Sequence, residues 1–571
     1  MEVWIVNAKI ALVLLGWIVA VCGFGFLALV CLKKIAHLFK IDNTLIIDTK
    51  FYILFVGLLG VFFLSLIVQF LHFITPISSS VSFAFMGLGV GLFAYLLPRG
   101  KRAQTMVEDT LQKRSTLFIA IILAFILCAV FAMRPESAYD TGLYHIQAVK
   151  WVQQEALHFG IANIHTRFGF NNILYNFAAL TEVSHFFPQI RSFLSVEIIC
   201  FFFFVSGVLG LVHLQHKNLD DIFMGIALSL ALIFSYWLGG GMYAEGVLGI
   251  LGLSVCGYCL KLLNLKAPLQ NLRFSFFILY MIGFFCVFIK ISAIFVLIGV
   301  VLVHWQCFRI SKQCLRDFLL FMLFGAFLGS LWALKGIITS GMIAYPASVG
   351  YFPKLPWAID DTTRAREVTI IANWARVAGT PNGQELLNNG TWMGLWWDKY
   401  VWVGTFKLFL QFCLAGIVGI VLLRVIGWLK FAHFKKYAVL GLSLIGGIVF
   451  WFLSAPDPRF GYQYFFPLGA FLVAFCVLVL LERKQYHLVI IILCICSIHI
   501  NKHLATSGID TADKIPHIEL KSATTDSGMV VFLPTKGDRV YDAPLPATPY
   551  FNPKLSKKSF LGRDMYYKEA K

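Results

Sequence analysis

The chain has 571 residues, of which 59% are hydrophobic and 13% charged, with a formal net charge of +18. Soluble globular proteins carry roughly a quarter charged residues, so this composition excludes an ordinary soluble domain. The basic residues are spread over short connections between apolar segments, which argues against a nucleic-acid partner. The 13 cysteines lie in apolar segments or at their ends, so we predict neither disulfides nor a CxxC metal site.

Apolar runs long enough to cross a bilayer as helix recur almost to position 500. We therefore predict an all-α polytopic membrane protein with about fourteen transmembrane helices. The predicted spans are 8–32, 51–74, 79–97, 116–133, 192–213, 221–238, 241–260, 273–289, 291–308, 317–334, 404–423, 437–454, 462–481 and 486–500.

Every second connection between these spans is rich in Lys and Arg, from 33–40 to 483–484. By the positive-inside rule these connections are cytoplasmic, and both termini lie outside. Two large outer loops, 134–191 and 335–403, and the tail 501–571 then face away from the cytoplasm. The tail combines an expected strand at 529–533 with a proline-rich run, which predicts a small cap, with a poorly ordered tail as the alternative.

The first outer loop carries Tyr139 and Asp140 a few residues after the fourth span. A carboxylate there can take a proton from a hydroxyl acceptor while a lipid-borne substrate approaches from the bilayer, so Asp140 is a candidate general base. The alternative is that Asp140 only caps the helix that follows. We expect that helix, about 143–156, to be amphipathic and to lie along the membrane surface.

Three side chains of this helix are candidates for substrate binding, namely Tyr144, His145 and Lys150, together with Tyr139 before it. His145 and Lys150 are expected on or near the polar side of the helix, where they could orient a substrate or contact a phosphate. A solvated helix face explains both equally well.

Two further charged residues, Glu245 and Lys290, stand at the outer ends of apolar spans. Ionisable groups at such depth are costly and tend to be functional. Lys290 would suit an anionic phosphate leaving group, and Glu245 could pair with it or orient a substrate. The alternative for Lys290 is that it extends to the lipid headgroups.

Asp457 and Arg459 alternate with prolines in the turn before the span 462–481. Pro456 and Pro458 restrict the backbone, so the pair is displayed in a fixed way, and Arg459 could bind a phosphate with two hydrogen bonds. A local ion pair that only closes the turn is the alternative. In the second outer loop, Arg364 and Arg366 could approach the phosphate from the other side.

With these residues laid out, the chain resembles the GT-C superfamily of polyprenyl-phosphate-dependent glycosyltransferases, which includes protein O-mannosyltransferases and lipid A aminoarabinose transferases. The resemblance covers roughly 116–500 and rests on the two large outer loops and on short strings. These strings are Tyr139-Asp140, Ala244-Glu245-Gly246, the turn at Lys290, and Pro458-Arg459-Phe460. Further strings are similar to those of a bacterial, largely uncharacterised branch. Residues 1–115 would be accessory helices, 116–500 a GT-C-like core, and 501–571 an extracytoplasmic segment.

The resemblance implies an inverting transferase that moves a sugar from a polyprenyl phosphate to a hydroxyl of an extracytoplasmic glycan, lipid or protein. It implies a bacterial inner membrane with the active site facing the periplasm. Asp140 would be the base, and Lys290 and Arg459 would stabilise the phosphate. No cofactor is expected with certainty, a divalent cation and the oligomeric state are left open, and the partners are the lipid-linked sugar, its acceptor and membrane lipid. The alternatives are an O-antigen-type polymerase or ligase and a secondary transporter or lipid flippase.

Overall fold

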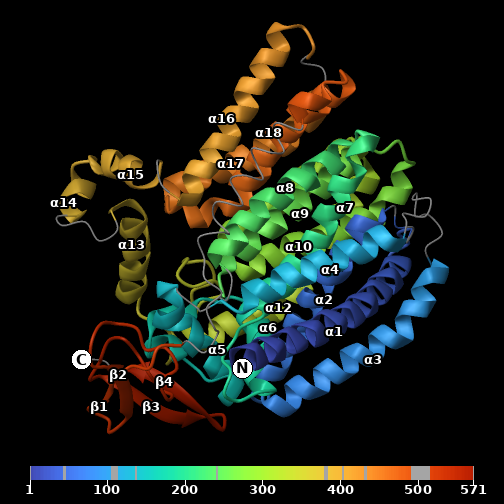
Figure 1. The fold of residues 1–571 in the computed structure, drawn as a ribbon. Helices are drawn as coiled ribbons and strands as arrows, with labels where there is room; N and C mark the ends of the chain where they lie inside the picture. Colours follow the sequence, from blue (N-terminus) through green and yellow to red (C-terminus); the bar gives the residue numbers. More distant parts are fainter. Residues whose placement is uncertain are drawn as a thin grey trace.

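The computed structural model describes residues 2–42, 45, 47–103, 114–134, 138–238, 242–377, 383–401, 404–429, 434–489 and 515–569. Long helices form one bundle, and two β-hairpins lie at one end of it (Figure 1). The long helices are α1 (Glu2–Leu38), α2 (Thr49–His72), α3 (Ser79–Ala103), α4 (Arg114–Ala132), α7 (Ser195–Val212), α8 (Leu219–Leu238), α9 (Ala244–Asn264), α10 (Leu269–Ile289), α11 (Ile294–Phe308), α12 (Lys312–Ser340), α16 (Gly404–Val425), α17 (Ala438–Ser454) and α18 (Tyr462–Glu482).

Shorter elements make up the connections and the C-terminal segment. The short helical segments are η1 (Thr141–His145), α5 (Ile146–Gln154), η2 (Ile161–Asn163), η3 (Thr166–Gly169), α6 (Leu174–Thr181), η4 (Val183–His185), η5 (His213–His216), η6 (Ile291–Ala293), α13 (Asp361–Val377), α14 (Gly383–Asn388), α15 (Trp392–Tyr400), η8 (Lys435–Tyr437) and η9 (Pro458–Gly461). The strands β1 (Leu520–Thr524) and β2 (Val530–Pro534) form one antiparallel hairpin, and β3 (Leu555–Phe560) and β4 (Arg563–Lys568) form the other.

Among the described residues, 12 helices are long and apolar enough to cross a membrane, so the chain is a mostly helical polytopic membrane protein. Each predicted span except the last coincides with a helix of the bundle. The span 221–238 is α8, a helix of 20 residues that is not among those 12. The last span, 486–500, lies mostly outside the described residues, so the predicted total of fourteen is not reached within them.

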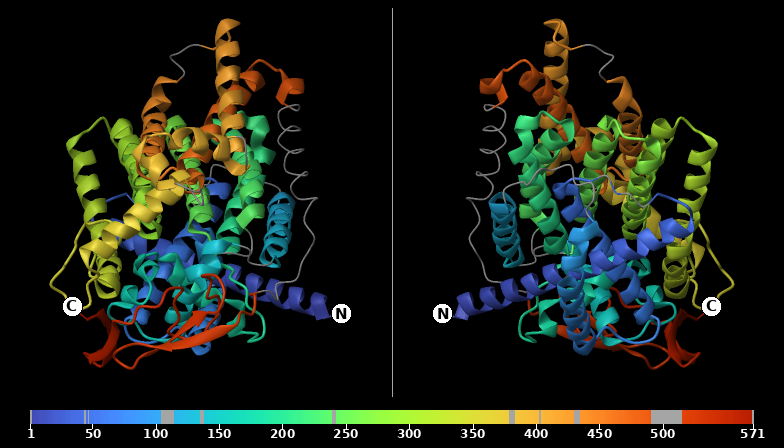
Figure 2. Two further views of the ribbon diagram at one scale, coloured as in Figure 1. Left: turned by 90° about the vertical axis from the view of Figure 1, so that its left-hand side faces the viewer. Right: turned by 90° about the vertical axis from the view of Figure 1, so that its right-hand side faces the viewer.

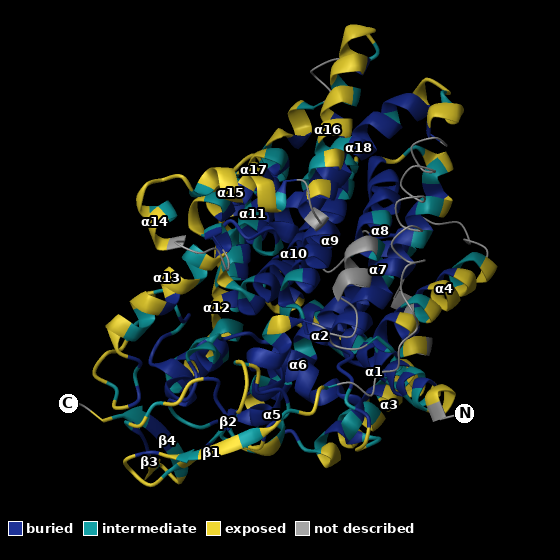
Figure 3. Ribbon diagram, turned by 60° about the vertical axis from the view of Figure 1, so that its left-hand side comes forward, coloured by how far each residue is buried: buried dark blue, intermediate teal, exposed yellow. Residues whose placement is uncertain are grey.

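The bundle has a buried centre and an apolar outside. The helices α2, α7, α9, α10 and α18 are buried along most of their length, whereas α3, α12 and α16 expose apolar faces (Figure 3). An apolar face on the outside of a bundle suits a lipid environment. Small residues allow close helix packing, because a Cβ at Gly25 of α1 or at Gly60 of α2 would collide with a backbone carbonyl of the facing helix.

The basic connections meet at one end of the bundle. Arg273, before the middle of α10, donates to the carbonyl of Lys40 and is paired with Asp317 of α12. Arg316 donates to the carbonyl of Phe39. These contacts bring the connections around Lys40, Arg273 and Arg316, which are far apart in the sequence, together at one end of the bundle.

A buried ion cluster joins the helices at this end. The ammonium of Lys50 in α2, which is 1% exposed, lies 2.6 Å from Asp48, 2.8 Å from Asp220 and 2.6 Å from Asp221. Lys261 of α9 also binds Asp48, at 2.7 Å. The cluster therefore ties α2 to α8 and α9 through charges that burial would otherwise penalise.

The first outer loop and the C-terminal hairpins gather at the opposite end (Figures 1 and 2). The strand predicted at 529–533 is β2. The helix predicted at about 143–156 forms as η1 and α5, but it does not lie free on a surface. Its apolar residues are buried, it packs on α6, and the segment 540–543 covers it. By contrast, α13–α15 of the second outer loop project from the bundle and are largely exposed (Figure 3).

Candidate functional site

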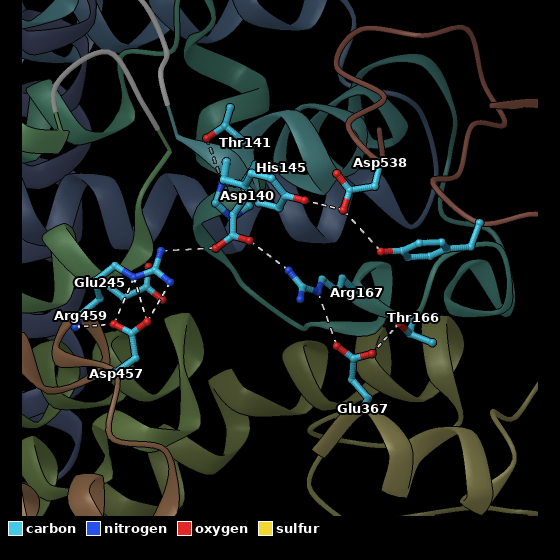
Figure 4. A network of polar contacts seen from close by, with 12 residues as sticks. Asp140, Thr141, His145, Thr166, Arg167, Glu245, Glu367, Asp457, Arg459 and Asp538 are labelled. Atoms are coloured by element: carbon cyan, nitrogen blue, oxygen red, sulfur yellow. Dashed lines mark hydrogen bonds and ion pairs between the residues drawn. The ribbon is translucent and has the colours of Figure 1, made fainter. Parts of the chain in front are cut away.

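Asp140 stands just before η1, a π-helical turn in which the Ile146 N–H donates to the carbonyl of Thr141. Turns of this type often occur at functional sites. The Asp140 side chain is 23% exposed and lies between two guanidinium groups (Figure 4). Arg167 approaches one carboxylate oxygen at 3.0 Å, and Arg459 approaches the other at 3.5 Å.

Asp457 and Arg459 form the local pair that the sequence suggested, but Arg459 also reaches Asp140. The carboxylate of Asp457 accepts the backbone N–H of Arg459 at 3.0 Å and contacts its guanidinium at 3.0 Å. The Asp457 side chain is only 6% exposed, whereas that of Arg459 is 31% exposed. The buried acid thus holds the arginine in place while the guanidinium remains accessible at the end of α18.

Glu245 and Lys290 pair with each other at 2.9 Å, which confirms the pairing that the sequence suggested. Glu245 also lies close enough to Arg459 for electrostatic attraction, and Figure 4 shows it beside the Asp457–Arg459 pair. The Lys290 ammonium sits 3.5 Å from the centre of the Phe460 ring. This second pair therefore adjoins the first where α9 and α18 begin and α10 ends.

Two residues that sequence reasoning missed complete the cluster. Arg167 of η3 links Asp140 to Glu367 of α13, whose carboxylate lies 3.5 Å from the Arg167 Nε. Glu367 also accepts the Thr166 hydroxyl at 2.9 Å. Arg167 is an isolated charge within an otherwise uncharged stretch of the first loop, which is the signal that could have identified it.

The arginines predicted from the second outer loop do not join this cluster in the described structure. Arg364 pairs with Asp361 at 2.6 Å on the surface of α13, and Arg366 is exposed. Glu367, which follows Arg366 directly, is buried and turns toward Arg167. The second loop therefore contributes an acidic side chain to the cluster, whereas the sequence predicted arginines there. The reason is that the packing of α13 decides which of its faces points inward.

Tyr144 and His145 lie under the cluster rather than on a solvated face. His145 is 4% exposed, and burial lowers its pKa to about 4, although Asp140 and Glu245 attract its charged form. Burial also raises the pKa of Tyr144 well above its usual value. The Arg167 guanidinium lies 5.2 Å from the centre of the Tyr144 ring. Both residues are therefore buried, uncharged side chains that pack against the ionic cluster.

Lys150 and Tyr139 bind the C-terminal segment. Lys150, also expected on the polar side of its helix, is buried and pairs with Asp542 at 2.9 Å. The Tyr139 hydroxyl donates to Asp538. Tyr541 of the same segment packs against Gly142. These contacts hold η1 in place, and with it the backbone next to Asp140.

The cluster as a whole contains the carboxylates of Asp140, Glu245, Glu367 and Asp457 and the cations of Arg167, Lys290 and Arg459. Four negative and three positive charges leave a formal net charge of −1. Every cation already has an acidic partner. The Lys290 and Arg459 side chains are 30% and 31% exposed, so their remaining N–H donors are accessible to an anion.

The groups that could share a metal ion lie elsewhere among the described residues. One is Asp48, Asp220 and Asp221, and the other is His213, His216 and Asp221. The Lys50 ammonium already occupies the first of these groups. Asp140 belongs to neither group.

The helices and this cluster define a polytopic integral membrane protein with an ionic site at one end of its bundle. Residues 9–466 match the family described as a domain of unknown function, DUF8201, and the chain belongs to this family. The match begins within α1, so the N-terminal helices are part of the family's common unit. No curated protein and no solved structure matches the chain.

Proposed function

We propose that this chain is a membrane glycosyltransferase of the GT-C type, which transfers a sugar from a polyprenyl phosphate to a hydroxyl acceptor with inversion. The observation that carries the proposal is the position of Asp140. It is a partly exposed carboxylate just before η1, between Arg167 and Arg459 and next to the Glu245–Lys290 pair. A base beside cations that can receive a phosphate is what such a transfer requires.

In the proposed reaction, Asp140 accepts the proton of the acceptor hydroxyl as its oxygen attacks the anomeric carbon. The bond from that carbon to the phosphate oxygen breaks, and the polyprenyl phosphate leaves with an added negative charge. Arg459 and Lys290 would stabilise this charge as it develops. Inversion follows because the acceptor attacks from the side opposite to the leaving group.

The ion pairs suggest how donor binding would activate the base. Arg459 lies 3.5 Å from Asp140 but 3.0 Å from Asp457, so its contact with Asp140 is the weaker of the two. A donor phosphate that attracts Arg459 would loosen this contact and leave Asp140 freer to accept a proton. The GT-C-like core, the periplasmic position of the site and a bacterial inner membrane are parts of the same proposal.

The test is transfer from a polyprenyl-linked monosaccharide by the full chain in lipid nanodiscs, compared with Asp140→Asn. Loss of the base should reduce turnover by roughly 100- to 10,000-fold. Asn keeps the shape but not the charge, so thermal unfolding of both proteins must accompany the assay. Asp361→Asn is the matched control, because Asp361 is an exposed acid paired with Arg364 away from the cluster.

Full activity of a folded Asp140→Asn protein would remove Asp140 from the mechanism. Movement of the lipid-linked sugar across the bilayer without a transferred product would favour a flippase instead. Transfer of a whole glycan from a pyrophosphate carrier would favour a polymerase or ligase.

A further inference from the structure

Lys335 is a buried cation near the outer end of α12, away from the Asp140 cluster. It is 8% exposed, and its Nζ donates to the Asn176 side-chain oxygen at 2.8 Å. In the described part of the chain no carboxylate forms an ion pair with it. A buried charge without a counter-ion is costly and marks a site where a ligand can supply the missing charge.

The amides around Lys335 present further donors. Lys335 can only donate, so it faces the oxygen of Asn176, whose Nδ2 then donates to the Gln69 oxygen at 3.2 Å. This leaves the Nε2 of Gln69, a residue 1% exposed, buried without an acceptor among the described residues. The charge of Lys335 thus orients both amides so that a donor remains for a ligand.

A second cation lies on the hairpin that covers this end of the bundle. Arg563 of β4 donates to the backbone carbonyls of Leu157, at 2.7 Å, and Phe73. A guanidinium has five N–H donors, so these contacts do not exhaust it. Lys335 and Arg563 both act electrostatically on His72 at the end of α2. The carboxylates nearby are Glu155, which contacts His158, and Asp564, which pairs with Lys557.

A small, mostly apolar cavity lies beside Arg563. Its volume is about 190 Å³, and it is lined by Phe73, Leu157, Phe159, Ile338, Leu561 and Arg563. Phe73 follows His72 directly, and Ile338 is one helical turn beyond Lys335. The ends of α2 and α12 flank the cavity. The ends of membrane-spanning helices lie at the depth of the lipid headgroups.

We propose that this cavity binds an anionic phospholipid. A segment of its chain lies against Phe73, Phe159 and Ile338, and its phosphate is attracted to Arg563 and Lys335. The apolar lining favours a lipid over a free phosphate, and the unneutralised cations favour an anionic lipid over a zwitterionic one. The bound lipid would join the β3–β4 hairpin to α2 and α12. The proposal shares no residue with the Asp140 cluster and is independent of sugar transfer.

The experiment measures thermal unfolding of the purified full chain with three separate probes, phosphatidylglycerol, phosphatidylcholine and inorganic phosphate. We expect phosphatidylglycerol to raise the melting temperature of the wild type and the other two probes to have little effect. Arg563→Gln and Lys335→Gln should each weaken the apparent affinity for phosphatidylglycerol by about tenfold or more, as expected for a lost charge-assisted hydrogen bond. Lys568→Gln is the matched control, because Lys568 also lies on β4 but binds Thr363.

Equal stabilisation of the wild type and both variants by phosphatidylglycerol would overturn the proposal. An equal shift with inorganic phosphate or with phosphatidylcholine would overturn the assignment of an anionic lipid. Should Lys335→Gln fail to fold, Arg563→Gln still decides the question, since Arg563 lies outside the membrane helices.

Discussion

Asp140 shares its two carboxylate oxygens between guanidinium groups from distant parts of the chain, Arg167 in the first outer loop and Arg459 after α17. Each guanidinium is also held by a second acid, Glu367 or Asp457. The carboxylates and guanidinium groups therefore hold fixed positions before a ligand binds. Such an arrangement lowers the free-energy cost of reorganising charged groups around a bound ligand.

His145 should make the protein sensitive to acid at the level of one residue. Burial lowers its pKa from 6.5 to about 4, so the unfolded chain binds a proton more readily than the folded one. His145 therefore does not reduce the free energy of unfolding above pH about 6.5. As the pH drops toward 4, its protonation in the unfolded chain lowers that free energy by on the order of 3 kcal/mol. We expect the melting temperature to fall over this range in the wild type and to fall less in His145→Gln.

Two further histidines affect how the result of this experiment is interpreted. Burial also lowers the pKa of His165, to about 3, so part of the acid sensitivity should remain in His145→Gln. His487→Gln changes an exposed histidine and should leave the pH profile unchanged. Identical profiles for the wild type and His145→Gln would show that His145 is not responsible.

The sequence predicted the members of the site that stand at the ends of apolar spans. Glu245, Lys290 and Arg459 belong to this group, because a charge at a span boundary is visible in the sequence itself. Glu367 was missed because the inward face of α13 depends on tertiary packing. Lys150 was expected on a polar helix side, but its partner Asp542 is 392 residues away, beyond the reach of a local pattern.

At the scale of elements, the C-terminal segment and η1 are joined by backbone hydrogen bonds. The N–H groups of Val540 and Tyr541 both donate to the Gly142 carbonyl at 2.9 Å. Gln147 of α5 donates to the carbonyls of Tyr541, at 2.9 Å, and Ala543, at 2.8 Å. A segment from the far end of the chain thus completes the hydrogen bonds of the turn that follows Asp140.

Gly142→Ala should loosen this junction. A Cβ at Gly142 would lie 2.6 Å from the Tyr541 ring, so the ring and its segment must shift. Such overpacking costs about 1–3 kcal/mol, which predicts roughly tenfold faster release of the C-terminal segment by limited proteolysis. Gly87→Ala is the control, since no atom lies within 4 Å of the Cβ position there. Removing the ring as well, in Gly142→Ala with Tyr541→Ala, tests whether the clash is the cause.

At the scale of the whole molecule, hydrophobic length and alternating charge predicted the helices well. Spans such as 51–74 and 462–481 are close to α2 and α18 because a membrane requires a minimum apolar length whatever the packing. The same rule says nothing of how the helices pack. The ion cluster of Lys50 with Asp220 and Asp221 joins α2 to α8, and its long-range partners were not predictable from either segment alone.

The two ends of the bundle should face opposite sides of the membrane, with the basic end in the cytoplasm. Lys536 in the C-terminal segment and Lys312 at the start of α12 are both exposed, so Lys536→Cys and Lys312→Cys form a matched pair. In cells whose outer barrier has been permeabilised, a membrane-impermeant maleimide should label the cysteine at 536 and spare that at 312. Inverted vesicles should give the reverse. Labelling of 312 from outside would invert the orientation and would place Asp140 on the cytoplasmic side, where a polyprenyl-phosphate donor for extracytoplasmic transfer could not be used.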